Sequence, residues 1–302
     1  MLLCGSGAWI ILRIFALMLR KYITLCRRCV LAVIFSITAM TAGAQILVTG
    51  GGEPMYADSI KRDFSNQPYF GLYKDNYFIF GPSVGPKATK QNTNIKFQIS
   101  VAQRLTRSTL PWGTYLYLFY TQKCFWNVLE NSMPMTDLNF NPGIGLTKPL
   151  FVKNRYIGKL TFMIEHESNG RDSIWSRSWN RISLAGNVFV NKNLMVHAKA
   201  WIPIVDGENN KDLLDYVGIF QYGFQVLSDN RRFCGGITIV PRKRFLSCNT
   251  VIDLSFRIFR KDNQYLTLQF YNGYGEGLLD YNKFHSQIRV GLLIKPKLFS
   301  DY

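Results

Sequence analysis

The sequence contains few cysteines and, beyond residue 44, no long apolar run. Six cysteines occur in 302 residues, and three lie within the first 44, which leaves Cys124, Cys234 and Cys248. An odd number leaves at least one thiol unpaired within a single chain, no CxxC or Cys/His metal spacing occurs in this part, and a Cys234–Cys248 disulfide stays open. Because a membrane helix needs about 20 apolar residues, a helical membrane domain is excluded. The cysteine count and spacing exclude a zinc site and a framework of several disulfides.

Acidic residues are also scarce. The chain has 19 Asp and Glu against 36 Lys and Arg, which gives a formal net charge of +17, and removal of the first 44 residues leaves +12. The basic residues are scattered rather than gathered on a helix or in a compact cluster, which argues against nucleic acid as a partner. Anionic lipid headgroups are the predicted partners of this charge.

Residues 1–44 are predicted to be a cleaved signal segment. Basic residues precede an apolar stretch at 30–40, and small residues at 42–44 provide a cleavage site. The mature protein is expected to begin at Gln45, and Met18 is a candidate for the true initiator. An uncleaved transmembrane anchor over the same apolar stretch is the alternative.

Aromatic residues are abundant, and apolar and polar residues alternate over many short segments. Phe, Tyr and Trp make up 15% of the chain, whereas charged residues make up only 18%. In one such segment Ile252, Leu254 and Phe256 alternate with Asp253 and Ser255. Alternation over about ten residues is typical of strands in an outer-membrane barrel, although a soluble sandwich gives the same period. With the signal segment, the pattern predicts an all-β fold, a transmembrane antiparallel β-barrel.

Twelve strand candidates fill residues 69–302 and follow a periplasmic lead-in at 45–68. An even number lets an antiparallel barrel close without an edge strand. Charged residues on the polar faces, such as Lys96, Arg104 and Asp253, are expected to form a polar network inside a closed, filled barrel. The candidates are 69–81, 94–106, 113–124, 138–148, 156–168, 179–190, 193–204, 216–227, 233–241, 250–260, 264–273 and 284–295.

The stretch from His166 to Arg181 places a histidine, a serine and an asparagine on one face of a predicted hairpin. His166 and Ser168 share the parity of the apolar residues before them, and Asn180 shares the parity of the apolar residues after it. Since strand side chains alternate, all three lie on the apolar face. A serine needs a base to take its proton, and the base needs a group that holds its tautomer. These roles fall to Ser168, His166 and Asn180, although two polar residues near a strand end are by themselves an ordinary occurrence.

The residues around this triad resemble those of the outer-membrane phospholipase A family. The family's HxSNGR pattern occurs at 166–171, and its SRSWNR pattern occurs at 176–181 with the family's spacing. Further matches at 120–123, 273–276 and 280–282 extend the resemblance over most of the chain after the signal segment. The resemblance implies a twelve-stranded barrel in the outer membrane of a Gram-negative bacterium, active as a calcium-dependent homodimer.

The resemblance also implies roles for single residues. It makes His166 the general base, Ser168 the nucleophile and Asn180 the residue that orients the histidine. The backbone N–H of Gly170 would help to form the oxyanion hole.

For Ca²⁺, the resemblance implies a set of oxygen ligands, as calcium prefers. These are the backbone oxygen of Arg171, the hydroxyl of Ser176 and Ser132 of the partner subunit; without the family, the two serines would read as ordinary loop residues. The family has an aspartate at the position of Ser173, whereas this chain has its aspartate one residue earlier. Asp172 is therefore a candidate ligand, or the site binds calcium more weakly.

These observations predict an outer-membrane serine phospholipase of A1 or A2 type, which hydrolyses acyl ester bonds of phospholipids and lysophospholipids. Its expected partners are the lipid substrate, the outer membrane and a second copy of the chain. One alternative is a structural or transport barrel without activity, which only the Asp172/Ser173 shift favours. The other is a lipopolysaccharide deacylase, which the same triad could serve.

Overall fold

The computed structural model describes residues 69–107, 109–205, 208–243, 247–259, 262–296 and 300–301. All of them belong to the compact unit Gly52–Tyr302. The predicted signal segment and the lead-in lie outside the described residues. Within these ranges no helix is long and apolar enough to cross a membrane.

Strands dominate the described residues, and the only helical elements among them are short. The 3-10 turns are η1 (Pro111–Gly113) and η2 (Ser173–Trp175), and one α-helical turn, α3, covers Leu214–Val217. The strands are β1 (Phe70–Leu72), β2 (Asn76–Pro82), β3 (Thr93–Arg104), β4 (Tyr115–Trp126), β5 (Met135–Val152), β6 (Arg155–Ser168), β7 (Ser178–Phe189), β8 (Leu194–Ile204), β9 (Phe220–Leu227), β10 (Phe233–Pro241), β11 (Cys248–Arg257), β12 (Gln264–Gly273) and β13 (His285–Ile294).

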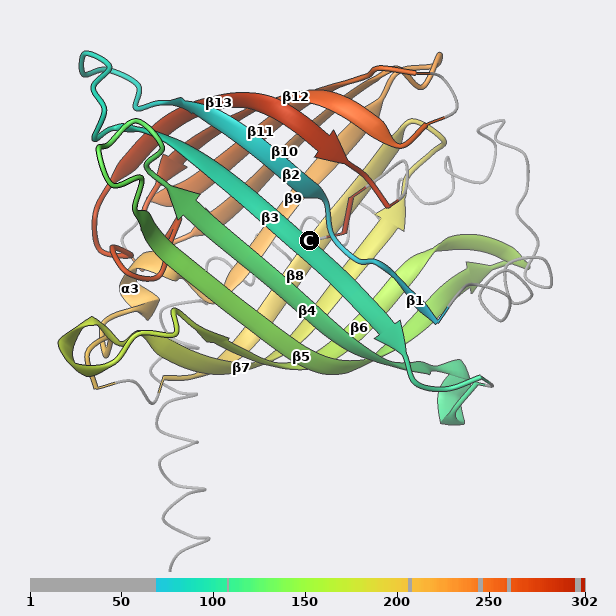
Figure 1. Ribbon diagram of the computed structural model, residues 1–302. Coiled ribbons are helices and arrows are strands. Elements are labelled where there is room, and N and C mark those ends of the chain that lie inside the picture. Colours follow the sequence, from blue (N-terminus) through green and yellow to red (C-terminus); the bar gives the residue numbers. More distant parts are fainter. Residues whose placement is uncertain are drawn as a thin grey trace, which may run out of the picture. The chain divides into compact units, whose positions relative to one another are not determined.

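The strands form one antiparallel sheet that closes into a barrel (Figure 1). From β2 onward each strand pairs with the next in sequence, and β13 pairs with β2 to complete the circuit. β1 and β2 both pair with β3, at successive positions along it, so the two segments form one strand interrupted between Leu72 and Asn76. The barrel therefore has twelve strands, which confirms the predicted fold class.

Side chains alternate between the inside and the outside of the barrel wall. Along β6, Thr161, Met163 and Glu165 are buried, whereas Phe162 and Ile164 are 43% and 53% exposed. The exposed face is thus apolar and the buried face largely polar. This order is the reverse of that in a soluble sandwich and is typical of a barrel surrounded by lipid.

The two ends of the barrel differ in their connections. At one end the two-residue turn Lys153–Asn154 joins β5 to β6, with both residues at positive φ. At the other end, longer loops span 127–134, 169–177 and 274–284. We call the latter the loop end; it is where β6 finishes and β7 begins.

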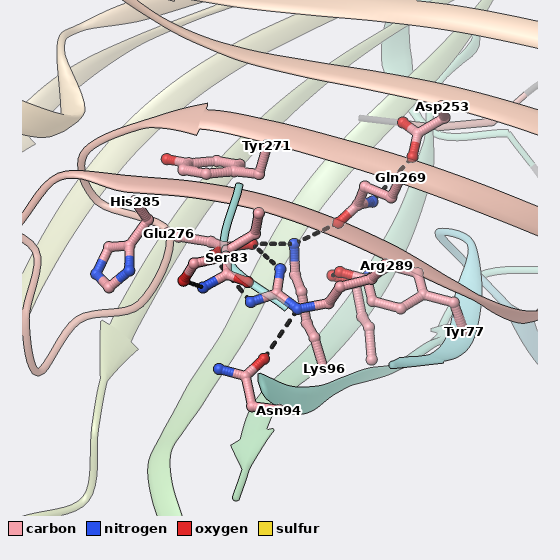
Figure 2. A network of polar contacts seen from close by, with 12 residues as sticks. Tyr77, Ser83, Asn94, Lys96, Asp253, Gln269, Tyr271, Glu276, His285 and Arg289 are labelled. Atoms are coloured by element: carbon pink, nitrogen blue, oxygen red, sulfur yellow. Dashed lines mark hydrogen bonds and ion pairs between the residues drawn. The ribbon is translucent and has the colours of Figure 1, made fainter. Parts of the chain in front are cut away.

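A charged network fills the interior near the loop end (Figure 2). The ammonium group of Lys96 on β3 donates to Gln269 on β12 at 2.7 Å and to Glu276 at 3.1 Å. The Arg289 guanidinium on β13 donates to Glu276 at 2.7 Å and to Asn94 at 2.9 Å. Because Glu276 belongs to the 274–284 loop, this network ties the loop to three strands of the wall.

The last described residues lie inside the barrel and hold a second network. Asp301 is 8% exposed, accepts a hydrogen bond from Asn187 on β7 at 2.8 Å and pairs with Lys159 on β6. Ser300 donates its backbone N–H to Gln225 on β9 at 2.8 Å. The interior is thus packed with polar side chains, in agreement with the expected filled barrel.

The strand register decides whether Cys234 and Cys248 can form a disulfide. Cys124, Cys234 and Cys248 are all free. In the β10–β11 pair, Cys234 lies opposite Ser255 and Cys248 lies opposite Pro241, at the two ends of the hairpin. Seven strand positions separate them, roughly 24 Å, whereas a disulfide requires Cα atoms within about 7 Å. The strand register therefore excludes a Cys234–Cys248 disulfide, which the sequence left open.

Candidate active site

The structure brings His166 and Asn180 into direct contact across two neighbouring strands. The β6–β7 register places His166 opposite Asn180 and Ser168 opposite Ser178. The Nδ1 atom of His166 lies 2.8 Å from the amide oxygen of Asn180. Since an amide oxygen only accepts, this contact places a proton on Nδ1 and leaves Nε2 as the basic nitrogen.

Ser168 lies two residues beyond His166 on the same face of β6. Both side chains are half-buried. The Ser168 hydroxyl and the His166 ring, both within the described residues, make no hydrogen bond with each other. Catalytic hydrogen bonds are often long without substrate and tighten in its complex, so this geometry is compatible with a nucleophile and its base.

The triad faces outward, toward the apolar exterior of the barrel. Ile164 precedes His166 on its face and is 53% exposed, and Leu184, on the face of Asn180, is 48% exposed. The neighbouring residues Glu165 and Arg181 point to the interior and are buried. The three polar groups therefore sit at the edge of an apolar surface near the loop end, as their parity predicts.

Asn169 organises the loop that joins β6 to β7. Its side chain is 3% exposed, donates to the Trp175 carbonyl at 2.9 Å and accepts from the Arg177 N–H at 2.9 Å. Its backbone N–H donates to the Arg177 carbonyl at 3.0 Å. These bonds close the loop over residues 170–176, which include the candidate oxyanion and calcium residues. Asn169 was not among the residues predicted to be functional, although an Asn that follows a strand and bonds to its own loop is a recognised turn signal.

Gly170 occupies a backbone conformation that favours glycine. Its φ is +62°, and an added Cβ would lie 2.9 Å from the Phe140 ring of β5. Both the left-handed φ and the close ring therefore disfavour a larger residue. This conformation fixes the direction of the Gly170 N–H two residues beyond Ser168.

The oxygen atoms predicted to bind calcium lie in this loop and in the neighbouring one. Arg171 and Asp172 are exposed, and Ser176 is half-buried just after η2. No hydrogen bond among the described residues ends on the Arg171 carbonyl, the Asp172 carboxylate or the Ser176 hydroxyl. Ser132 is exposed in the 127–134 loop. These hard oxygen donors fit the chemistry of Ca²⁺.

Behind the triad, on the inner face of the wall, lies a buried ion network. Arg181 donates to Glu165 at 3.0 Å and to Glu167 at 2.6 Å, and Lys199 pairs with Glu165 at 2.6 Å. The Ser183 hydroxyl also donates to Glu165. The sequence predicted only that charged residues on the polar strand faces point inward, because alternation gives the face of a side chain and not its partner.

The chain is similar to known proteins over nearly the whole barrel. The family model for phospholipase A1 matches residues 69–294. Phospholipase A1 from Proteus vulgaris is 30% identical over 241 residues, which are 73% of this chain and 78% of that protein. Phospholipase A1 from Escherichia coli K12 is 30% identical over 213 residues, 66% of this chain and 69% of that protein.

Solved structures agree with this assignment. Outer membrane phospholipase A from Escherichia coli superposes with a TM-score of 0.66 at 26% identity, over 75% of this chain and 98% of that one. The Salmonella typhi outer membrane phospholipase, a dimer with bound calcium, gives a TM-score of 0.69 at 26% identity, over 80% and 98%. An active-site mutant of the Escherichia coli protein, with an asparagine replaced by alanine, gives 0.67 at 25% identity, over 81% and 100%. The chain is thus an outer-membrane β-barrel that belongs to the phospholipase A1 family.

Proposed function

We propose that this barrel is a serine phospholipase that hydrolyses acyl ester bonds of phospholipids and lysophospholipids at the outer membrane. The observation that carries the proposal is the 2.8 Å contact between His166 Nδ1 and Asn180 on the outer face, two residues from Ser168. The active-site asparagine of the Escherichia coli relative supports the role of Asn180. A substrate in the bilayer can reach this face without entering the barrel.

Hydrolysis proceeds in two steps. The Ser168 oxygen attacks the ester carbonyl while His166 Nε2 takes the hydroxyl proton, and the resulting imidazolium is stabilised by Asn180. The Gly170 N–H faces the developing oxyanion. His166 then returns the proton to the leaving lysophospholipid alcohol, which leaves an acyl-enzyme. In the second step water, deprotonated by His166, attacks the acyl carbon and releases the fatty acid and free Ser168.

The donor set around the loop supports calcium as the cofactor. Arg171 would offer its carbonyl, Ser176 its hydroxyl and Asp172 its carboxylate. A fourth protein oxygen would come from Ser132 of the partner subunit, so activity would require a homodimer, as the calcium-bound dimer of the Salmonella typhi relative suggests. Bound calcium would supply a Lewis acid that stabilises negative charge next to the attacked carbonyl.

A calcium-switch assay tests this function. Purified barrel in detergent micelles should release fatty acid from phosphatidylcholine in millimolar calcium, and an excess of chelator should stop the release. Magnesium serves as the control cation, because it is smaller and demands stricter octahedral geometry than calcium. Folded barrel that releases no fatty acid at any calcium concentration would contradict the enzyme and favour an inert scaffold. Release from lipopolysaccharide alone would indicate the deacylase.

The position of Asp172 leads to a separate prediction. If its carboxylate is a calcium ligand, the Asp172→Asn variant should need about tenfold more calcium for half-maximal activity, since one charged donor becomes neutral. The rate at saturating calcium should change little. Asp229→Asn is the matched control, because Asp229 lies in the exposed turn between β9 and β10. An unchanged calcium requirement in Asp172→Asn would remove Asp172 from the ligand set.

A further inference from the structure

The ladder between β5 and β6 is interrupted opposite the candidate catalytic histidine. Phe140 pairs with Ser168 and Gly143 pairs with Glu165, and no pairing occurs between them. The register is the same on both sides of this gap, so Pro142 lies opposite His166. Proline has no backbone N–H, and the His166 carbonyl therefore receives no hydrogen bond from Pro142.

The side chain of Asn141 supplies the missing donor. Its amide nitrogen donates to the His166 carbonyl at 2.7 Å. Its amide oxygen accepts from the Arg181 guanidinium of β7 at 3.3 Å. The Asn141 side chain thus bridges the backbone of His166 to the strand that carries Asn180.

Arg181 is itself fixed by several contacts, so its hydrogen bond to Asn141 can fix the position of the Asn141 side chain. The guanidinium is buried, pairs with Glu165 and Glu167 on β6, and lies 4.4 Å from the centre of the Trp179 ring. These contacts join β6 and β7 on the inner face, directly behind the His166–Asn180 pair on the outer face. The side-chain amide of Asn141 connects this set of contacts to β5.

We propose that Asn141 is a positioning residue for catalysis, which sets the backbone of His166 and hence the direction of its ring toward Ser168. The inference rests on the proposed function. Asn180 fixes the position of His166 Nδ1, but the orientation of the imidazole ring also depends on the position of the His166 backbone. Without Asn141, the His166 carbonyl has no donor on its β5 side, because Pro142 cannot supply one. An error of about 1 Å in such a group lowers a rate by up to roughly 100-fold.

The test compares kcat and KM for the wild type and four variants of the full chain in micelles with saturating calcium. Asn141→Ala removes both contacts and should lower kcat about tenfold while KM stays within about twofold. Asn141→Asp keeps an acceptor for Arg181 but loses the donor to His166, and should lose as much kcat on the plateau of its pH–rate profile. Asn141→Ala/Pro142→Ala restores a backbone N–H opposite His166 and should recover most of the lost kcat.

Thr147→Ala is the matched control. Thr147 is a buried residue of β5 whose hydroxyl bonds to Thr161 of β6 at 3.2 Å, so it joins the same two strands without touching the site. This variant should keep wild-type kcat. Heat-dependent electrophoretic mobility shows whether each barrel is folded.

Two results would overturn the inference. One is a folded Asn141→Ala or Asn141→Asp barrel with wild-type kcat. The other is a double variant that stays as slow as Asn141→Ala, because the loss would then not pass through the His166 carbonyl. If Ser168→Ala instead keeps wild-type activity, the proposed function itself has failed, so the two failures are distinguishable.

Discussion

The Ser168→Ala variant is expected to release fatty acid at least about 10⁴-fold more slowly than the wild type. Alanine cannot form the acyl-enzyme, and the residual rate would come from the oxyanion site and substrate binding alone. The fold should be unaffected, because Ser168 is half-buried and its hydroxyl bonds to no other described residue. The loss should therefore appear in kcat and not in stability.

The rate losses caused by substitution of His166 and of Ser168 are expected not to add. If His166 and Ser168 act as one unit, as proposed, the double variant His166→Ala/Ser168→Ala should be no slower than either single variant. The measurement is fatty-acid release from micellar phospholipid in calcium, with Thr147→Ala as the active control. Additive losses in the double variant, or substantial release by Ser168→Ala, would show that the serine and the histidine do not act together.

Replacement of Glu276 by glutamine should destabilise the barrel by about 3–5 kcal/mol. Glu276 is 3% exposed and is the shared partner of Lys96 and Arg289 (Figure 2). Glutamine keeps the shape of the side chain but removes its charge, which leaves two buried cations without their anion. Unfolding by urea in detergent measures the difference.

The pH dependence of this effect has a definite sign. Burial alone disfavours the carboxylate, but Lys96 and Arg289 outweigh it and hold the pKa of Glu276 at about 2, below its usual 4.5. The stabilisation is therefore complete above pH 4.5 and is lost as the pH falls toward 2. The difference in the free energy of unfolding between the wild type and Glu276→Gln should decrease as the pH falls over that range.

An exposed ion pair provides the control for Glu276→Gln. Lys243 and Asp215 are 57% and 45% exposed, so Asp215→Asn should cost less than about 1 kcal/mol. An equal, small cost for both variants would mean that the interior network contributes specificity rather than stability.

Period and parity predicted the strands and the face of the site, but the choice of a membrane barrel over a soluble sandwich also needed the signal segment and the motif. Each of the twelve predicted strands overlaps a strand of the structure, and His166 and Asn180 lie on the predicted outer face. Strand ends were less exact: β5 runs from Met135 to Val152, well beyond the predicted 138–148. The first strand is also interrupted between Leu72 and Asn76, where three consecutive polar residues, Lys74 to Asn76, break the alternation, a sign that the prediction did not use.

Partners inside the barrel could not be predicted, because alternation assigns a face and leaves the neighbour undefined. Lys96 and Glu276 are 180 positions apart, and only closure of the barrel and the fold of the 274–284 loop bring them together. The same limit left the Cys234–Cys248 pairing undecided, since sequence proximity to a hairpin does not tell which end a residue occupies. In the case of Asn141 the sequence does carry a signal, because a proline within a strand, here Pro142, indicates a missing ladder hydrogen bond.

The outward position of the triad has a consequence for inhibitor design. The outer wall of a barrel is convex, and the residues next to His166 and Asn180 on it, Ile164 and Leu184, are about half exposed. Compounds that depend on enclosure by a concave pocket find no enclosure on such a wall. Lipid and the partner subunit of the proposed dimer supply the remaining surface that contacts a bound molecule, so an effective inhibitor must carry an acyl chain or partition into the membrane. Its potency should follow its concentration in the bilayer rather than in water.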